Sequence, residues 1–356
     1  MQGATSSPYG KDKTLTPLFF WSGGKIRKRS IFFMSNYKTA ESVSPKHPDK
    51  ICDQISDAIL DAHLVQDPDA RVAVDVAGGH GTVFVTGEVT SKAKNVDVKA
   101  IVKRLAGNVT VIEHIASQSL EIAAGVDIGG AGDQGIMVGY ATNETPELLP
   151  LELILARQLN QYIYKKWPYD GKTQITLKDG EIVSVVASFQ HAPKSELMTQ
   201  VKQWLRTQKL AELGVLDLHI NPAGDWSVGG FDADAGLTGR KLIVDNYGPH
   251  VPIGGGAFSG KDPSKVDRSA AYMARKIAID YLKSRKASEV FVYLAYAIGY
   301  DQPLEATVNI DGKQEEVAGY DLSPNNIIKF LDLKRPIYEQ TARYGHFGHL
   351  DLAWES

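Results

Sequence analysis

One stretch of the sequence guides the interpretation of the rest, and it runs Gly254-Gly255-Gly256-Ala257-Phe258-Ser259-Gly260-Lys261-Asp262-Pro263-Ser264-Lys265-Val266-Asp267-Arg268. Its glycines let backbone N–H groups approach a ligand closely, and the basic side chains that follow supply fixed positive charge. Interleaved aspartates are expected where a polyphosphate binds together with a divalent cation. The stretch begins like a P-loop, but Asp262 stands where that motif needs a serine or threonine hydroxyl. The sequence therefore predicts a phosphate site that is not of the Walker type.

Length and composition exclude several classes of protein. The chain has 356 residues, enough for two or three domains, and its 43% hydrophobic and 23% charged content is ordinary for a globular protein. A net charge of −3 argues against general nucleic-acid binding, so a polyanion site must be a local cluster of cations. The single cysteine, Cys52, cannot form an intrachain disulfide, and no apolar run is long enough to span a bilayer. We therefore expect a cytoplasmic protein without a membrane or nucleic-acid partner.

The first 33 residues differ from the rest of the chain. Serine, glycine, proline and lysine are mixed with short apolar runs, and the basic run Lys25–Arg29 lies between two of these runs. This order is wrong for a signal peptide, and a solvated tail is a better interpretation than a membrane contact. We interpret residues 1–33 as a disordered extension upstream of the folded chain, with Met34 as a natural start.

Beyond this extension, periodicity and turn residues divide the chain into three successive strand-and-helix units. The first helix begins at Pro48, buries Ile51, Ile55, Ile59 and Ala62 on one stripe, and ends near Asp67. The rest of this unit is predicted to hold strands over 71–76 and 82–89, a helix over 96–105 and an apolar run over 109–115. The second is predicted to hold a helix over 149–166, strands over 173–177 and 182–190, and a helix over 195–210.

The third unit is predicted to contain a strand over Lys241–Asp245, a helix over 265–284, a strand over 290–298 and a helix over 323–331. Between the first two units, residues 123–135 include five glycines, which indicates a ligand-facing loop. The pattern as a whole predicts an α+β fold built from three similar units.

Several blocks, in order along the chain, resemble the S-adenosylmethionine synthetase (methionine adenosyltransferase) family. They extend over roughly residues 36–354 and are Glu41–Ser44 with His47–Lys50, Gly130–Gly135, Gly139–Thr145, Asp234–Lys241, the glycine-rich stretch quoted above, and Tyr344–Gly348. The resemblance implies three structurally similar domains in a pseudo-threefold arrangement, with sheets packing at a dimer interface. We accordingly divide the chain into an N-terminal domain (34–124), a central domain (125–228) and a C-terminal domain (229–356).

The resemblance also implies a reaction. The substrates would be ATP and L-methionine, whose sulfur attacks the ribose 5′ carbon and displaces tripolyphosphate, which is then hydrolysed to pyrophosphate and phosphate. Family members use two magnesium ions and a potassium ion per site. They form homodimers with active sites at the subunit interface, and these can associate into a dimer of dimers. Close alignment of the thioether and a cationic pocket for the leaving group are the physical requirements.

Triphosphate-side roles follow from the matching positions. His47 would stabilise the leaving oxygen, and the matching cations are Lys172, Arg240, Lys241, Lys261 and Lys265. The catalytic set among these is His47, Arg240, Lys261 and Lys265. The alternative for His47 is a residue that caps a helix, and the alternative for the cations is solvated surface charge.

The metal-binding positions are carboxylates. Asp49 and Asp267 match the magnesium ligands, with a first-turn helix acid and a capping-box partner of Ser264 as the alternatives. Asp75 stands where the family usually has the glutamate that binds potassium, so the shorter acid puts potassium dependence in question.

The remaining positions concern the nucleoside and methionine. Asp170 and Ile298 match nucleoside contacts, and Trp226 replaces the usual adenine-stacking phenylalanine. The alternative for Asp170 is an Asp-Gly turn, and the alternative for Ile298 is packing in the core. The methionine-side residues would be Glu88, Gln118, Asp133 and Asp234. For Glu88 the alternative is an exposed strand residue, and for Asp133 it is a turn. The loop between Gln118 and Asp133 looks shorter than the mobile gate of common bacterial members.

Two other functions stay open at this point. A phosphotransferase using the 254–261 loop would release ADP, although Asp262 counts against it. A catalytically silent homologue that regulates a partner would be expected to lose charged site residues, which this chain retains. The pair His346 and His349 lacks the further ligands that a zinc site needs.

Overall fold

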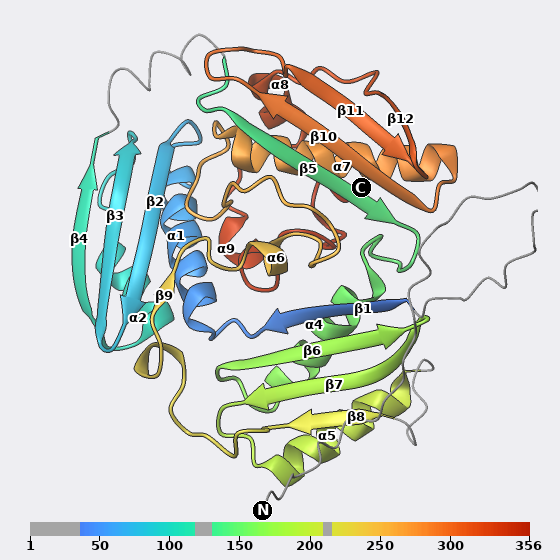
Figure 1. Cartoon of the computed structure of the whole chain (residues 1–356). Helices are drawn as coiled ribbons and strands as arrows, with labels where there is room; N and C mark the ends of the chain where they lie inside the picture. The colour runs from blue at the N-terminus through green and yellow to red at the C-terminus, as the bar shows by residue number, and fades with distance from the viewer. Residues whose placement is uncertain (1–35, 118–129, 209–215) are drawn as a thin grey trace, which may run out of the picture. The chain divides into compact units, whose positions relative to one another are not determined.

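The computed structural model describes residues 36–117, 130–208 and 216–356 (Figure 1). The predicted extension over 1–33 and the predicted methionine contact Gln118 lie outside the described residues. Residues 36–356 form one compact unit. Within its described part, helices accompany three four-stranded β-sheets, which confirms the predicted mixture of helices and strands.

Each sheet contains a β-hairpin extended on both sides. The hairpins are β2 (Arg71–Gly79) with β3 (Thr82–Thr90), β6 (Gly171–Lys178) with β7 (Glu181–Phe189), and β10 (Glu289–Tyr296) with β11 (Glu305–Ile310). Beyond β3 and β7, parallel strands follow, and beyond β11 an antiparallel one: β4 (Thr110–Ala116), β8 (Asp217–Ile220) and β12 (Lys313–Glu316). The three sheets therefore share most of their connectivity.

The other edge of each hairpin pairs with a strand from a distant part of the chain. These antiparallel strands are β9 (Gly236–Leu237) on β2, β1 (Tyr37–Val43) on β6, and β5 (Gly135–Thr142) on β10. The sequence pattern does not predict them, because such pairing is fixed by tertiary contacts rather than by local propensity. As a result, no sheet is built from one continuous segment.

Helices cover one face of each sheet (Figure 1). Helix α1 (Pro48–Leu64) packs on β2, α4 (Leu151–Tyr164) on β1 and β6, and α7 (Val266–Arg285) on β5 and β10. The shorter helices are α2 (Val98–Ala106), α5 (Lys194–Thr207), α6 (Leu242–Asp245), α8 (Pro324–Phe330), α9 (Tyr338–Thr341) and the 3₁₀ turn η1 (Gly230–Asp232). One apolar core lies between α4, α5 and the β6–β7 sheet, while the other two sheets share a second core.

Helix α1 follows its prediction closely. Pro48 occupies the first turn, and Ile51, Ile55 and Ile59 are buried, although Ala62 is only half-buried. The helix nevertheless buries polar residues on its other faces, including Asp49, Asp53 and Asp57. A helix buried all round places its charged groups inside the protein, where each needs a partner.

The predicted strand over Lys241–Asp245 is wrong. Residues Leu242–Asp245 form the short helix α6. The β-branched Ile243 and Val244 favour a strand locally, but tertiary contacts decide otherwise. Asp245 is buried beside Lys50, whose ammonium lies 2.5 Å from its Oδ1. The helical turn brings this carboxylate inward directly after the cations Arg240 and Lys241.

Candidate active site

The first helix presents two predicted site residues where the chain enters it. His47 is the N-cap of α1, and its Nδ1 accepts the backbone N–H of Asp49 at 3.2 Å. Strand β1 leads into this corner, and its last residue, Val43, pairs with Lys172 of β6. The chain thus connects the sheet that carries Lys172 to the helix that carries Asp49. Residues far apart in sequence meet at this junction.

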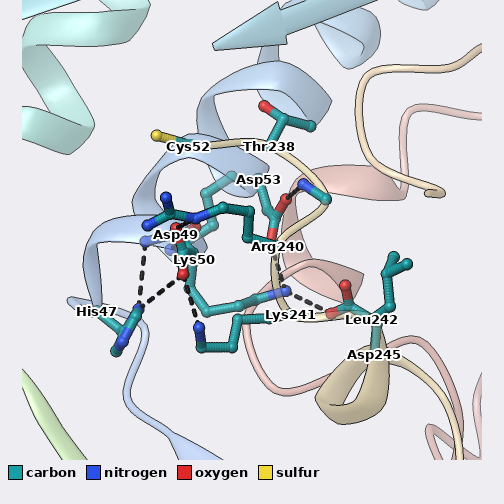
Figure 2. Close-up of polar contacts among 12 residues, drawn as sticks. His47, Asp49, Lys50, Cys52, Asp53, Thr238, Arg240, Lys241, Leu242 and Asp245 are labelled. Atoms are coloured by element: carbon teal, nitrogen blue, oxygen red, sulfur yellow. Dashed lines mark hydrogen bonds and ion pairs between the residues drawn. The ribbon is translucent and has the colours of Figure 1, made fainter. Parts of the chain in front are cut away.

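Asp49 lies at the centre of a cluster of cations (Figure 2). Its Oδ1 accepts Nε of Arg240 at 2.8 Å and the N–H of Leu237 at 3.0 Å, and its Oδ2 accepts Nζ of Lys241 at 2.6 Å. Burial raises the pKa of this carboxyl, but the hydrogen bonds from Lys241 and Leu237 outweigh it and hold the pKa below its usual value. Asp49 is therefore an anion that organises Arg240 and Lys241.

His47 is neutral in this environment. Burial, with the positive charges of Lys241 and Lys172 nearby, lowers the pKa of its imidazole to about 3. Because Nδ1 accepts a hydrogen bond, the ring proton of the neutral imidazole lies on Nε2. His47 can thus donate a hydrogen bond to an anion without being an imidazolium ion. The helix cap predicted as the alternative role is present, and it leaves Nε2 available.

Asp170 and Lys172 lie close to the same corner. Asp170 is buried, and its Oδ2 accepts the N–H of Gly230 at 3.0 Å. Burial raises the pKa of this carboxyl, and the bond from Gly230 and the charge of Lys172 oppose the rise. The Asp-Gly turn alone does not account for that long-range bond. Lys172 itself is exposed at the start of β6.

A second cluster surrounds the glycine-rich segment. Lys261 pairs with Asp267, and Nζ of Lys265 lies 2.5 Å from Oδ2 of Asp262. Asp262 also accepts the N–H of Val72 at 2.7 Å and that of Ser264 at 2.8 Å. From the sequence, Asp262 was identified only as a departure from the P-loop pattern. Its position three residues before Lys265, a spacing that favours an ion pair in a turn, is the signal that could have identified it.

The capping-box alternative for Asp267 is wrong. The N-cap of α7 is Lys265, which makes no side-chain cap, and the Asp267 carboxylate pairs with Lys261. Asp267 therefore faces the cationic segment.

Strand β2 brings the two clusters to one edge. At its end, β9 pairs with Ala77 and Gly78, and the chain continues directly to Arg240. Nearer its start, Ala73 forms an isolated antiparallel bridge with Lys261. The glycine loops that carry the predicted cations thus lie one after the other along the same strand edge. Asp75 lies between them on β2 and is exposed. Partial desolvation by the surrounding protein raises the pKa of its carboxyl above the usual value, although the charge of Lys261 opposes this rise.

The other predicted residues are less enclosed. Glu88 is half-buried on β3 beside Ala73, and Trp226 is half-buried. Asp133 and Asp234 are exposed, and each accepts only a neighbouring backbone N–H among the bonds of the described residues. The Ile298 side chain is 59% exposed, which excludes its alternative as a core residue within this chain.

No enclosed pocket unites these side chains within the described part of the chain. A cavity of about 270 Å³ borders Arg240 and Lys241, beside Glu41. Another, of about 630 Å³, borders the second cluster at Asp262 and is lined by Arg71 and Lys329 among others, but by none of the site residues predicted from the sequence. Asp133, Asp234 and Ile298 are exposed and line neither of these cavities.

The described residues contain no group of three or more histidine, cysteine, aspartate or glutamate side chains arranged to hold a metal ion. His346 is fully buried with Nδ1 bonded to the Tyr272 hydroxyl at 2.7 Å, and His349 Nε2 contacts the Gly345 carbonyl, so this pair has core partners. Among the helices of these residues, none has the length and apolar character that crossing a membrane requires.

Cations on two glycine loops, carboxylates paired with them and a neutral histidine define a site suited to a polyphosphate. Family comparisons agree with this class. The C-terminal domain model of S-adenosylmethionine synthetase matches residues 228–356, the N-terminal model residues 35–124 and the central model residues 128–226. The chain belongs to the S-adenosylmethionine synthetase family, the methionine adenosyltransferases.

Individual relatives are similar over most of their length. The chain is 44% identical to S-adenosylmethionine synthase 1 of Frankia casuarinae, with 89% of this chain and 95% of the relative covered. It is 43% identical to S-adenosylmethionine synthase of Brachyspira hyodysenteriae, with 90% and 95% covered. The first alignment runs over 382 residues, more than the 356 of this chain, so that relative contains residues that this chain lacks.

Proposed function

We propose that this protein makes S-adenosylmethionine from ATP and L-methionine. The methionine sulfur attacks the ribose 5′ carbon, tripolyphosphate departs with the 5′ oxygen, and the tripolyphosphate is hydrolysed to pyrophosphate and phosphate. The observation that carries this proposal is the alignment of Arg240, Lys241 and Lys261 along one edge of β2, beside the neutral His47. A leaving group of high negative charge needs cations held in place before the bond breaks.

His47, Arg240, Lys241, Lys261 and Lys265 act on the triphosphate in this proposal, with Lys172 beside His47. The Nε2–H of His47 donates to the departing oxygen, while the cations stabilise the charge that develops on the phosphates. Since the imidazole is neutral, it does not transfer a proton. The displaced 5′ oxygen is a phosphate oxygen, so no proton transfer to it is needed.

Magnesium fits the carboxylates present. Asp49 and Asp267 face the two cation clusters separately, and each is now bonded to cations that would pair with the phosphates once ATP is bound. Magnesium in nucleotide sites commonly takes only one or two protein carboxylates, with phosphate oxygens and water as the other ligands. Bound there, the two ions would neutralise triphosphate charge. Asp75 lies beside Lys261 on the exposed edge and is proposed to contribute to a potassium site.

The substrate ends are assigned by position. Trp226 is proposed to stack on adenine, with Ile298 against the base and Asp170 contacting the nucleoside. Glu88, Gln118, Asp133 and Asp234 are proposed to bind the methionine ammonium and carboxylate. The exposure of Asp133, Asp234 and Ile298 supports a site that a second subunit completes.

A homodimer with active sites at the subunit interface is part of the proposal. Leu237, Ala77, Phe84 and Ile112 pair in register across all four strands of the β4-β3-β2-β9 sheet, so their side chains lie on one face. Leu237, Phe84 and Ile112 are 40%, 39% and 50% exposed. An apolar row of this kind is typical of an interface and supports packing of this sheet against its counterpart.

The shared sheet connectivity supports a pseudo-threefold arrangement with domains over 34–124, 125–228 and 229–356, and the proposal places the enzyme in the cytoplasm. Asp262 disfavours a phosphotransferase: it is buried, bonded to two backbone N–H groups and to Lys265, and has no hydroxyl for a P-loop metal.

Product analysis tests the proposal. Purified protein is incubated with ATP, methionine, magnesium and potassium, and products are separated by chromatography and phosphorus NMR. S-adenosylmethionine with pyrophosphate and phosphate is expected. ADP would instead support phosphotransfer, and absence of turnover by the purified dimer would support a silent homologue.

A further inference from the structure

Helix α1 carries aspartates at intervals of four residues: Asp49, Asp53, Asp57 and Asp61. Residues four apart lie on one face of a helix, about one turn from each other. Only the first of them, Asp49, was predicted from the sequence to be a site residue. Asp53 and Asp57 are fully buried, so their charges must serve partners inside the protein.

Each aspartate accepts a backbone N–H from outside the helix, and together the four reach three segments of the chain. Asp49 bonds to Leu237 at 3.0 Å, Asp53 to Gly239 at 2.8 Å and Asp57 to Gly260 at 2.8 Å. Asp61 bonds to the N–H groups of Tyr338 and Glu339 at the start of α9, at 2.8 to 3.0 Å. One helix therefore holds both cation-bearing loops and, one turn further, a segment with no predicted site residue.

The bonds of Asp53 and Asp57 are alike in detail. Gly239 and Gly260 have φ angles of 77° and 81°, which other residues rarely adopt, and each directly precedes a site cation, Arg240 or Lys261. A side chain on Gly260 would also collide with the carbonyl of Val74. Each carboxylate accepts a hydrogen bond from the backbone N–H of the glycine directly before the cation. This bond fixes the backbone conformation from which the side chain of the cation extends.

Strand β2 also contacts both of these loops and sets the distance between them. The N–H of Thr238 bonds to the Val76 carbonyl, and the N–H of Val74 bonds to the Gly260 carbonyl. Two residues of a strand span about 6.6 Å, and one turn of α1 between Asp53 and Asp57 spans about 6 Å. Helix and strand therefore impose nearly the same separation on the two loops. A substrate with several linked phosphates needs cations at a fixed separation.

Buried cations compensate the negative charges of the Asp53 and Asp57 carboxylates. Asp53 lies 3.0 Å from Nζ of Lys50, which also bonds to Asp245, and Asp57 pairs with Arg268. Removing Asp53 leaves Lys50 with Asp245, whereas removing Asp57 leaves the buried Arg268 without its carboxylate. Asp53 is therefore the better position for a first test.

We propose that Asp53 and Asp57 are positioning residues for catalysis, Asp53 acting through Arg240 and Asp57 through Lys261. The inference rests on the proposed function, since it assigns these cations to the triphosphate. It predicts that each aspartate matters only while the cation that follows its own glycine is present.

Double-mutant cycles test this. Asp53→Ala is combined with Arg240→Ala, its own loop, and with Lys261→Ala, the other loop; kcat/KM for ATP and the Kd of inorganic tripolyphosphate are measured for each. We expect Asp53→Ala to weaken both by about tenfold or more alone and beside Lys261→Ala, but by less than about threefold beside Arg240→Ala. Asp53→Asn, which keeps an acceptor for Gly239, should recover part of the loss.

Asp61→Ala is the matched control. It removes a carboxylate from the same face of α1, but this carboxylate makes no hydrogen bond to a cation-bearing loop. It should lower stability to urea while leaving kcat/KM and tripolyphosphate affinity within about twofold. Equal effects of Asp53→Ala beside either cation variant would overturn the proposal, as would equal losses in the control. If Asp53→Ala does not fold, Asp53→Asn and Asp57→Asn take its place in the same cycles.

The two hypotheses fail separately. If the wild type binds tripolyphosphate but makes no S-adenosylmethionine, the proposed function is wrong, and the cycles in tripolyphosphate affinity still test positioning. If the wild type is active but the cycles are additive, only the positioning role is wrong.

Discussion

His47→Asn should separate two roles that the wild-type side chain combines. The imidazole is only 7% exposed, and its Nδ1 is occupied by the Asp49 N–H, so a single donor, Nε2–H, remains for a substrate. Asparagine is among the best N-cap residues and can accept the same N–H. It cannot place a donor where Nε2 lies. The substitution thus removes the donor and keeps the cap.

The expected size follows from each role. Loss of one preorganised donor to a developing oxyanion typically lowers kcat by about 10²- to 10³-fold, or about 2.7–4 kcal/mol. Loss of an N-cap costs about 1 kcal/mol of folding stability. We therefore expect His47→Asn to lose activity with stability unchanged, and His47→Ala to lose both. Initial rates at saturating ATP and methionine, with urea unfolding of each variant, measure the two effects.

One outcome would refute this reasoning. If His47→Asn keeps kcat within about threefold of the wild type while His47→Ala loses both stability and rate, His47 serves only as a helix cap. The donor to the leaving oxygen would then have to be another group.

Further predictions concern pH, ions, adenine and the leaving group. The pKa of His47 is lowered to about 3 in the folded protein, so as pH falls below 6.5 the unfolded state binds a proton that the native state does not, and the free energy of unfolding declines. Between pH 7 and 5, urea unfolding of His47→Asn should therefore show a smaller decline than that of the wild type. Equal declines in the two proteins would contradict this. Asp75→Glu should increase activation by potassium, measured as rate against potassium concentration; an unchanged response would mean that potassium binds elsewhere or is not used. Trp226→Phe should keep the KM for ATP within a few-fold while Trp226→Ala raises it about tenfold, since stacking on a base contributes about 1–3 kcal/mol; equal KM values would exclude stacking. Lys261→Ala should lower kcat/KM by about 10²-fold or more, because a leaving-group contact is lost, and near-normal turnover would refute its role.

Local sequence signals were sufficient for much of the fold. Pro48 and the isoleucine stripe locate α1, and the same kind of pattern locates α7 to within a residue at each end. The error at Lys241–Asp245 arose because the buried contact between Asp245 and Lys50 outweighs the strand preference of Ile243 and Val244. Strands β1, β5 and β9 were not predicted, since they are defined by partners far along the chain. Strands β8, β11 and β12 were not predicted either.

The site shows the same division. The family resemblance identified the residue types, and the comparisons confirm the family, but the pairing of Asp49 with Arg240 and Lys241 joins residues more than 190 positions apart. Asp53 and Asp57 were overlooked although their spacing was visible. Four aspartates at helical intervals on a helix with a buried isoleucine stripe are a signal, because buried carboxylates require partners.

The most direct test of the account follows the 5′ oxygen of ATP. ATP labelled with a heavy oxygen isotope at the bridge between the ribose 5′ carbon and the α-phosphate is converted with methionine, and products are analysed by mass spectrometry. Attack of sulfur on the 5′ carbon predicts that the label leaves entirely with the phosphates and is absent from the nucleoside product. Label retained on an adenosine-containing product would contradict displacement of tripolyphosphate and, with it, the role proposed for the cations along β2.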